Sequence, residues 1–320
     1  MKWLGIDIAK RKFDLAVLDN GKIRSKVFEN TPTGHETLLA WLAAHGHQLE
    51  ELHACMEATS QYYEKLAIFL HDAGIRVSVI NPLQIKAFGE SRLSRQKTDR
   101  ADAGLIAHFA EQQSPPLWHP APREIRELQR LLARLEAVQQ MRVQEQNRAY
   151  EAEGEALESV DRTLAHLKAE EETLRKRIRE HIDQHPHLSE QHALLTSIPG
   201  VGEQVSSHFM AWLRPERFDD ARQAVAFVGL SPKHRQSGDS VRGKTRLSKV
   251  GHARLRKILY LPAMSAIRYN SAAKAIAERL KASGKTGKVV IGAVMRKMIH
   301  WMFGVLKSGQ PFNPDLALAK

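Results

Sequence analysis

The sequence predicts an α/β N-terminal domain, a long helical spacer and a mostly helical C-terminal domain. Three observations support this division. Short apolar strand patterns alternate with helical patterns in the first third, residues 123–184 contain no proline and repeat apolar residues every three or four positions, and the last third is strongly basic. We therefore expect domain boundaries at 1–122, 123–186 and 187–320.

The expected order of elements in the N-terminal domain is three strands, a helix, a strand, a helix and a strand. The strands are expected at 3–9, 13–19, 23–29, 52–56 and 76–80, and the helices at 35–45 and 60–73. The pair Asn20-Gly21 is typical of a tight hairpin between the second and third strands. This order matches a ribonuclease-H-like α/β layer.

The pair Asn81-Pro82 is expected to end the last strand, 76–80. Residues 83–98 are polar and basic, and we expect them to form a mobile segment. Thr98 is a suitable N-cap for a helix at 99–112.

Four acids of this domain are candidates for one metal site. Asp7 lies inside the apolar run 3–8, where a lone carboxylate is costly unless it is paired or binds a metal. Glu57 follows the fourth strand, and Asp99 and Asp102 share one helix face. Oxygen ligands from three elements suit Mg²⁺ or Mn²⁺, and two such ions about 3.5–4 Å apart can act on a phosphodiester. The alternative is that each acid simply lies on a solvated face.

Two cations flank the helical pair of acids. Lys97 and Arg100 would either contact a phosphate near the metal or offset the repulsion between the acids. The sequence alone favours neither interpretation.

Residues 123–184 predict a helical hairpin or coiled coil, which is most often an oligomerisation spacer. Gly154 marks the expected break between its two helices, and Glu171 occupies a position where an apolar residue is expected. The apolar seam of the second helix contains Leu157, Val160, Leu164, Leu167, Leu174, Ile178 and Ile182.

In the C-terminal domain, helices are expected at 221–230, 258–282 and 288–307, with a basic loop and a helix start at 231–257. The turn 198–202 (Ile-Pro-Gly-Val-Gly) lies between two helical segments. Its backbone N–H groups would take a phosphate, or it is an ordinary Pro-Gly turn between helices.

The net charge of +12 is unevenly distributed. Residues 231–320 contain 19 Lys and Arg against three acids, which gives +16, so residues 1–230 carry −4. This asymmetry favours a polyanionic partner, most simply nucleic acid, over a merely soluble basic domain. The candidate nucleic-acid contacts are Lys97, Arg100, Arg235, Arg242, Lys244, Arg246, Lys249, Arg254, Lys285 and Lys288.

Other totals concern the cellular compartment. Cys55 is the only cysteine, so no intrachain disulfide is possible and we expect a cytoplasmic protein. We expect that no apolar stretch reaches membrane-spanning length, and the charged residues between Asp7 and Lys12 interrupt any signal sequence.

The basic loop contains a candidate nucleophile, Ser237. A serine hydroxyl needs activation, and the surrounding cations would orient a scissile phosphate and stabilise its developing charge. The alternative is a phosphate-contacting loop whose serines only donate hydrogen bonds. No Gly-x-Ser-x-Gly motif surrounds this serine, which argues against acyl hydrolysis.

The motifs together resemble those of the DEDD-type insertion-sequence transposases. These are relatives of the Piv invertase and are described as bridge-RNA-guided serine recombinases. The resemblance covers essentially the whole chain. It rests on the segments 5–10 (Gly-Ile-Asp-Ile-Ala-Lys), 56–59 (Met-Glu-Ala-Thr), 79–82 (Val-Ile-Asn-Pro), 97–103 (Lys-Thr-Asp-Arg-Ala-Asp-Ala), 197–202 (Ser-Ile-Pro-Gly-Val-Gly), 227–232 (Phe-Val-Gly-Leu-Ser-Pro), 237–243 (Ser-Gly-Asp-Ser-Val-Arg-Gly) and 292–297 (Gly-Ala-Val-Met-Arg-Lys).

The resemblance implies a RuvC-like N-terminal domain that binds Mg²⁺ through Asp7, Glu57, Asp99 and Asp102. It places the family's catalytic serine on Ser237, which would form a covalent phosphoserine with DNA. Ser240 remains the alternative nucleophile, since Asp239 stands where the family motif has a small residue.

The resemblance also implies the partners. These are double-stranded donor and target DNA, a structured noncoding guide RNA, and further copies of the chain in a dimer or tetramer. A nucleoid-associated, cytoplasmic location follows from such partners.

Two other functions compete with this interpretation. A Holliday-junction-type nuclease would use only the carboxylates and water, so its cleavage would not need Ser237. A non-enzymatic nucleic-acid scaffold would not need the acids. An actin-like sugar kinase is a third possibility for the motif around Asp7, but the chain lacks later glycine-rich phosphate loops.

Overall fold

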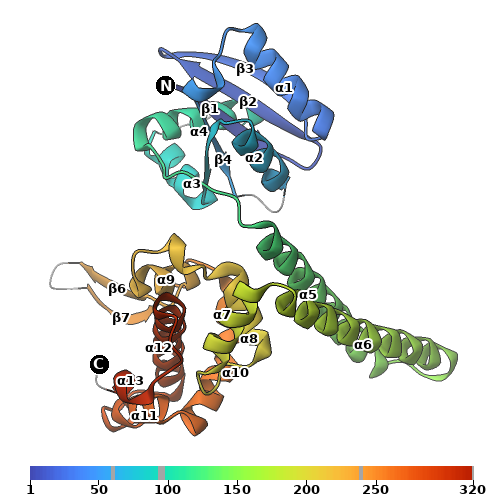
Figure 1. The fold of residues 1–320 in the computed structure, drawn as a ribbon, viewed down its shortest axis with the longest axis vertical. Helices are drawn as coiled ribbons and strands as arrows, with labels where there is room; N and C mark the ends of the chain where they lie inside the picture. Colours follow the sequence, from blue (N-terminus) through green and yellow to red (C-terminus); the bar gives the residue numbers. More distant parts are fainter. Residues whose placement is uncertain (59–61, 93–97, 238–240, 319–320) are drawn as a thin grey trace. The chain divides into compact units, whose positions relative to one another are not determined.

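The computed structural model describes residues 1–58, 62–92, 98–237 and 241–318, with the backbone alone at 234–237, 241–245 and 318. The chain folds as two compact units, Met1–Ala121 and Pro122–Lys320. The spacer expected at 123–186 belongs to the second unit (Figure 1).

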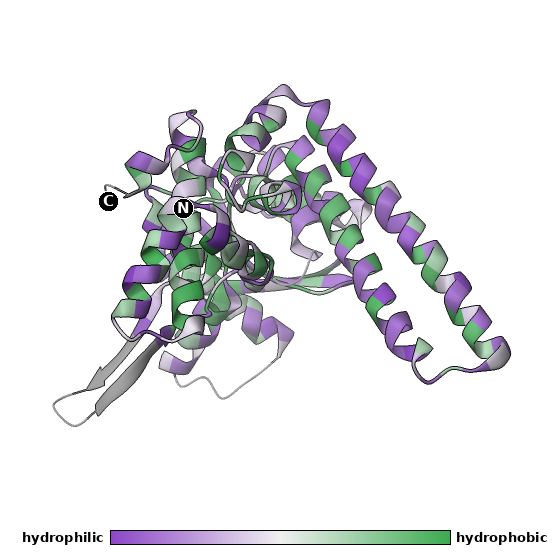
Figure 2. Ribbon diagram, turned by 90° about the horizontal axis from the view of Figure 1, so that it is seen from below, coloured by the Kyte–Doolittle hydropathy of each residue, from purple (hydrophilic) through white to green (hydrophobic). Residues whose placement is uncertain are grey.

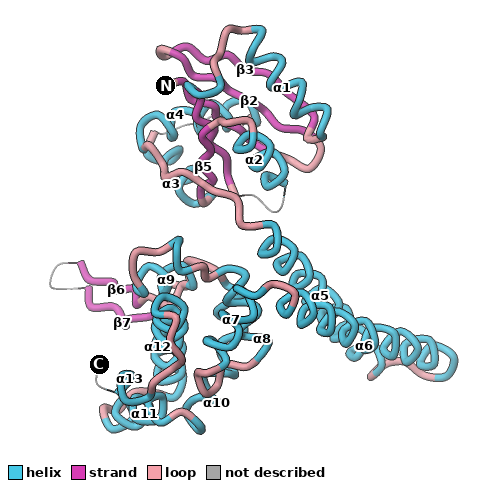
Figure 3. The backbone as a smooth tube through the Cα atoms, viewed as in Figure 1, coloured by secondary structure: helices cyan, strands magenta, loops and turns pink. Residues whose placement is uncertain are grey.

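The first unit is built on a five-stranded sheet with strand order β3-β2-β1-β4-β5. Figure 3 shows these strands in magenta. β1, β2 and β3 form an antiparallel meander, whereas β4 and β5 run parallel to β1. The expected strands are confirmed to within two residues at each end. Their bounds are β1 (Lys2–Ile8), β2 (Lys12–Asp19), β3 (Lys22–Glu29), β4 (Leu52–Glu57) and β5 (Arg76–Ile80).

Helices cover both faces of this sheet. The helical elements of the first unit are α1 (Pro32–Ala44), the 3₁₀ turn η1 (Leu49–Glu51), α2 (Tyr62–Asp72), α3 (Pro82–Ser91) and α4 (Asp99–Gln113). α1 and α2 pack on one face through residues such as Leu38 and Leu66. α3 and α4 pack on the other face through Ile85 and Ile106. The strands β1, β2, β4 and β5 are therefore largely buried, whereas most residues of the edge strand β3 are exposed.

The helix α3 corrects the expectation of a mobile segment at 83–98. The Asn81 side chain accepts a hydrogen bond from the N–H of Leu83, and Pro82 occupies the first helical turn. Asn and Pro are favoured at these two positions. The pair ends β5 at Ile80, as predicted, and it also starts a helix, which was not predicted. Residues 93–97 lie outside the described residues. The predicted N-cap of α4 is confirmed, because Thr98 accepts from the N–H of Ala101.

The second unit begins with an antiparallel helical hairpin, α5 (Arg123–Ala149) and α6 (Gly154–Asp183). The predicted break is confirmed at Gly154, whose φ of 54° disfavours other residues. Apolar residues of α6, such as Leu174, are buried in the hairpin, while its outer surface is largely hydrophilic (Figure 2). Glu171 is also buried there, and its carboxylate lies 2.5 Å from Nε of Arg142. That ion pair explains an acid in an apolar seam.

The remainder of the second unit is mostly helical. Its elements are α7 (Pro186–Thr196), α8 (Glu203–Trp212), η2 (Pro215–Arg217), α9 (Ala221–Val228), β6 (Pro232–Ser237), β7 (Val241–Leu247), α10 (Ala253–Tyr269), α11 (Ser271–Ala282), α12 (Gly287–Ser308) and α13 (Pro314–Leu318). The single helix expected at 258–282 is wrong. Asn270 separates α10 from α11, because its side chain accepts hydrogen bonds from the N–H groups of Ala272 and Ala273 and so caps α11.

The basic loop expected at 231–257 is also corrected. β6 and β7 pair as an antiparallel two-stranded ribbon, and α10 starts at Ala253. The strands are rich in Lys, Arg and Gln and lack the apolar alternation by which a strand is recognised. Backbone pairing in a ribbon needs no such alternation.

The helix α12 is long and apolar enough to cross a membrane by length and composition alone. More than half of its apolar window is buried inside the protein, through residues such as Val294, Met298 and Met302. It packs against α9, α10 and α11, and therefore acts as the core helix of the second unit. This contradicts the expectation that no stretch reaches spanning length, but the burial fits a soluble protein.

Candidate active site

Sheet register places Asp7 and Glu57 at neighbouring positions. The last pair between β1 and β4 is Ile6 with Met56, so both acids follow at the carboxyl ends of adjacent parallel strands. Successive residues of a strand face opposite sides of the sheet, so Asp7 faces the same side as position 5, and Glu57 faces the same side as Cys55. Both acids therefore lie on the sheet face that α4 covers.

Gly5 allows α4 to lie directly on β1. A Cβ atom at this position would overlap the carbonyl oxygen of Ala103 and the backbone nitrogen of Ala107. Because α4 approaches so closely, its first turn brings Asp99 and Asp102 near Asp7. The negative charges of both carboxylates raise the pKa of Asp7.

Burial and neighbouring negative charge together raise the pKa of Asp7 to about 6. Burial is the largest cause, because it removes the carboxylate from water. The charges of Asp102, Asp99 and Asp14 raise the pKa further, and Lys12 partly offsets them. A cation bound at this point would relieve the same repulsion.

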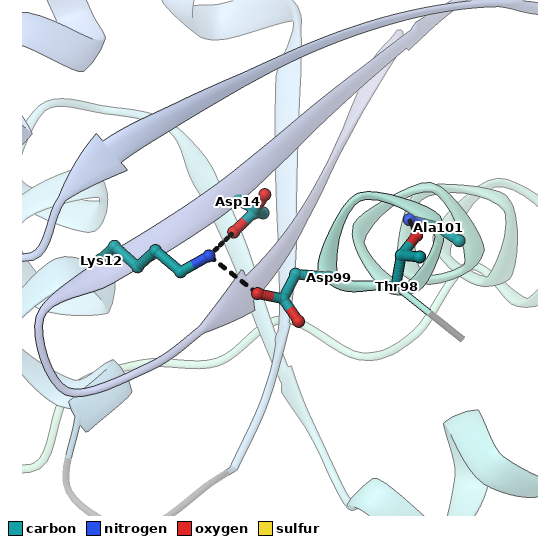
Figure 4. Close-up of polar contacts among 5 residues, drawn as sticks. All are labelled: Lys12, Asp14, Thr98, Asp99 and Ala101. Atoms are coloured by element: carbon teal, nitrogen blue, oxygen red, sulfur yellow. Dashed lines mark hydrogen bonds and ion pairs between the residues drawn. The ribbon is translucent and has the colours of Figure 1, made fainter. Parts of the chain in front are cut away.

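Lys12 links two elements of the site. Its Nζ lies 2.8 Å from Oδ2 of Asp99 on α4 and 3.3 Å from Oδ2 of Asp14 on β2 (Figure 4). The same contacts raise the pKa of Lys12 and lower that of Asp99. Asp14 pairs with Asp7 across β1 and β2 and is 7% exposed, so it is the most buried acid of the group.

Sequence reasoning missed Asp14 and Lys12. The criterion that singled out Asp7, an acid inside an apolar run, applies equally to Asp14 in the run 13–18 (Phe-Asp-Leu-Ala-Val-Leu). A hairpin between the first two strands also predicts that these two acids lie opposite each other.

The acids fit a hard divalent cation in their chemistry. Carboxylate oxygens are the ligands that Mg²⁺ and Mn²⁺ prefer. The pKa of Asp7 is raised first by burial and then by the charges of Asp102, Asp99 and Asp14, so the negative charge around Asp7 is only partly offset by Lys12. Within the residues that the structure describes, no three or more His, Cys, Asp or Glu side chains are close enough to hold one ion. The Lys12 ammonium instead bridges Asp14 and Asp99. The site is thus an acidic cluster with a lysine as its internal counter-ion.

Of the two cations that flank the helical pair of acids, only Arg100 belongs to the described residues. Arg100 is exposed at the start of α4 and lines a groove of about 510 Å³ with Arg92 and His108. Lys97 lies outside the described residues.

The candidate nucleophile is at the end of the ribbon in the second unit. Ser237 is the last residue of β6, and its backbone pairs with Val241 of β7. Arg235, Arg242 and Lys244 belong to the same two strands. Asp239 and the alternative nucleophile Ser240 lie outside the described residues. The ribbon therefore carries the predicted serine and its basic neighbours on one extended element.

Four further predicted nucleic-acid contacts are exposed. Arg246 and Lys249 lie at and just beyond the end of β7, and Lys285 and Lys288 lie at the turn from α11 to α12.

Arg254 differs from the other predicted contacts. Its Nε lies 2.7 Å from Glu136, Nη2 donates to the carbonyl of Leu132, and the guanidinium stacks over Trp212. These contacts fix α10 against α5, so the structure gives Arg254 a packing role.

The turn 198–202 packs against α10. Ile198 and Val201 are buried, and a Cβ at Gly200 would lie 2.8 Å from that of Ala266. Pro199 is exposed, and so is Gly202 at the end of the turn, where α8 begins and a Cβ would meet nothing within 4 Å. Packing therefore accounts for Gly200, whereas Gly202 remains available for the phosphate contact expected from the sequence.

Comparisons with known proteins identify the class. Residues 4–152 match the model of the DEDD transposases of the IS110 type, described as "Transposase", and residues 192–278 match "Transposase IS116/IS110/IS902 family". The pilin gene-inverting proteins of Moraxella bovis and Moraxella lacunata are each 32% identical over 314 residues, covering 97% of either chain. An "Insertion element IS110 uncharacterized 43.6 kDa protein" of Streptomyces coelicolor is 28% identical over 126 residues, which is 38% of this chain and 31% of that protein.

These matches define a DNA recombinase or transposase, an enzyme that acts on DNA. The chain belongs to the IS110-type DEDD transposase family. Members of this family typically use divalent metal ions, in agreement with the acidic cluster. The predicted family is therefore confirmed.

Proposed function

We propose that this chain is an RNA-guided recombinase of an insertion sequence, which cleaves and rejoins DNA through a phosphoserine. Asp7, Glu57, Asp99 and Asp102 bind Mg²⁺, with Mn²⁺ as a substitute, and Ser237 attacks the phosphodiester. The observation that supports this proposal most strongly is geometric. Strand register and the Gly5 contact bring acids from β1, β4 and α4 to one end of one sheet face.

The acids contribute binding and charge. Asp7, fixed in β1, is the natural centre of the set, because the charges of Asp99 and Asp102 both act on it. To bind the ion, the Asp99 carboxylate would have to break its ion pair with Lys12. When bound, the metal polarises the phosphodiester and stabilises the leaving 3′-oxygen.

The serine contributes the covalent step. Its Oγ forms a bond to phosphorus as the bond from phosphorus to the 3′-oxygen breaks. The serine proton goes to solvent, and the leaving 3′-oxygen takes a proton from solvent and is released as a hydroxyl. The 3′-hydroxyl of a new partner reverses this step, so rejoining needs no ATP. The basic ribbon, with Arg235, Arg242 and Lys244, would attract the phosphate and stabilise its charge.

The partners follow from charge and from the relatives. The +16 of residues 231–320 supports binding of donor and target DNA and of a structured guide RNA. The name of the pilin gene-inverting relatives supports an exchange of strands between two DNA sites. Such an exchange needs more than one active site, so we also propose a homodimer or homotetramer, located with the nucleoid in the cytoplasm.

Reconstitution tests this function. RNA that copurifies with the full-length protein is sequenced, and donor and target DNA that can pair with it are supplied with Mg²⁺. We expect joined recombinant products that disappear after RNase treatment and in chelator. Joining without RNA would exclude guidance, and cut but unjoined DNA from a protein with Ser237→Ala would identify a water-using nuclease.

A further inference from the structure

A groove of about 650 Å³ in the second unit is unlike the rest of the basic surface. It lies between the end of β7, α10 and the start of α12. Its apolar lining includes Leu230 and Met295, which are almost fully buried, and Leu247. Gly292 keeps the floor open, because a Cβ at this position would lie 3.3 Å from Cδ1 of Leu247.

Exposed apolar side chains form one wall of this groove. Tyr260 and Leu261 of α10 are 40% and 71% exposed. Met264, one turn further along the helix, is 44% exposed. The opposite side of α10, with Leu255 and Leu259, is buried in the core. An apolar wall open to water indicates a ligand with an apolar surface of its own.

Four cations surround the same groove: Lys249, Arg256, Lys257 and Lys288. Among its described lining residues none is acidic. Arg256 is held in place by a hydrogen bond of 2.8 Å from Nη1 to the carbonyl of Val228. The three lysines are exposed, and none of them forms an ion pair with a described residue. The ligand therefore carries negative charge as well as an apolar face.

We infer that this groove binds an unpaired nucleotide of a single-stranded polynucleotide, with its base against Tyr260 and its phosphates on the lysines. A base has flat apolar faces and is joined to an anion, so it meets both requirements. Bases in a duplex are stacked inside the helix and would not reach Tyr260. Leu247 of the groove pairs with Pro232, the first residue of β6. Ser237 is the last residue of β6, about 17 Å from Pro232 along the strand. A strand held in the groove thus lies near the element that carries the proposed nucleophile.

This inference rests on nucleic acid being the substrate, as proposed above, and binding alone tests it. The full-length protein is titrated, without metal, against fluorescent oligo-dT, oligo-U and a duplex of the same length. We expect Tyr260→Ala to weaken binding of single strands about 5- to 100-fold and that of the duplex by less than twofold. Tyr260→Phe should bind single strands as tightly as the wild type, because the base stacks on the aromatic ring and not on the hydroxyl.

The matched control is Tyr269→Ala. Tyr269 is on the same helix and 74% exposed, but it does not line the groove, so single-strand binding should be unchanged. Comparison of oligo-dT with oligo-U distinguishes a DNA strand from an RNA strand as the occupant.

A crosslink provides a second measurement that does not depend on a variant. An oligonucleotide carrying 5-iodouracil should crosslink to Tyr260 of the wild-type protein. Equal losses for single strands and duplex in Tyr260→Ala would overturn the inference, as would a changed oligomeric state with unchanged single-strand binding. If the wild-type protein recombines DNA but gives no crosslink at Tyr260, the inference about the groove is wrong, whereas the proposed function stands. Failure of the wild type to bind any nucleic acid would overturn the proposed function as well.

Discussion

Gly5 of β1 and Ala103 of α4 are in direct backbone contact, with no room for a side chain between them. Ala107, one turn later, closes the same contact. This approach sets the height of α4 above the sheet, and with it the distance from Asp99 and Asp102 to Asp7. A glycine in a strand thus determines how closely the acids of α4 approach Asp7.

Gly5→Ala should separate the acids. The new methyl group has to displace α4, so we expect the free energy of unfolding of the first unit to fall by roughly 1–3 kcal/mol. Metal-dependent cleavage should be lost at temperatures where the variant is still folded. Urea denaturation and a cleavage assay measure the two effects.

The matched control is Gly104→Ala on the same helix. A Cβ there meets only Cδ1 of Ile23, at 3.6 Å, which is ordinary contact. Alanine in a helix interior should stabilise the unit by roughly 0.5–1 kcal/mol and leave cleavage intact. Wild-type cleavage by Gly5→Ala would show that the height of α4 does not matter.

Asp7→Asn should stabilise the first unit while removing activity. The pKa of Asp7 is about 6 in the folded protein against an ordinary value of 3.8. The folded state therefore holds the proton more tightly, and wild-type stability falls as pH rises from about 4 through 6. After allowance for solvent screening, the variant should gain about 1 kcal/mol at pH 7.5 in chelator.

The pH and metal dependence provide the control. At pH 4 the wild-type carboxyl is protonated in the folded state, so the gain should disappear. Saturating Mg²⁺ should raise the melting temperature of the wild type but not that of Asp7→Asn. Equal melting temperatures for both proteins in every condition would contradict the clustering of charge at Asp7.

Lys12→Gln should tighten metal binding. The Lys12 ammonium neutralises Asp14 and Asp99 and repels an incoming cation. Removal of its charge should lower the Kd for Mn²⁺ several-fold, as measured by isothermal titration calorimetry on the full-length protein. Lys10→Gln is the control, because Lys10 is exposed in the adjacent turn and forms no ion pair with a described residue. Weaker Mn²⁺ binding by Lys12→Gln would mean that Lys12 organises the site rather than competing with the ion.

Periodicity predicted much of this fold, because burial determines most of its elements. The strands of the sheet, the cap at Thr98 and the break at Gly154 are where the sequence placed them. The errors occur where a polar residue has two meanings. Asn81-Pro82 stops one element and caps the next, and Asn270 interrupts an otherwise continuous helical pattern.

The acids were visible in the sequence, but their assembly was not. An acid inside an apolar strand identified Asp7, whereas Asp14 needs strand register and Lys12 needs the position of α4. The contact between Gly5 and Ala103 depends on tertiary packing, which no local pattern encodes. The contacts of Arg254 with Glu136 and Leu132 also depend on tertiary packing, so its packing role could not be predicted from a basic residue in a basic domain.

The central claim is that Ser237 becomes covalently attached to DNA, and mass spectrometry of the trapped protein–DNA adduct tests it most directly. The protein is incubated with its RNA, Mg²⁺ and donor DNA, denatured, treated with nuclease and digested to peptides. We predict a nucleotide on Ser237 in the wild type, no adduct in Ser237→Ala, and a retained adduct in Ser240→Ala. An adduct that persists in Ser237→Ala and disappears in Ser240→Ala would move the nucleophile to Ser240, and DNA cleavage without an adduct on either serine would contradict the phosphoserine mechanism.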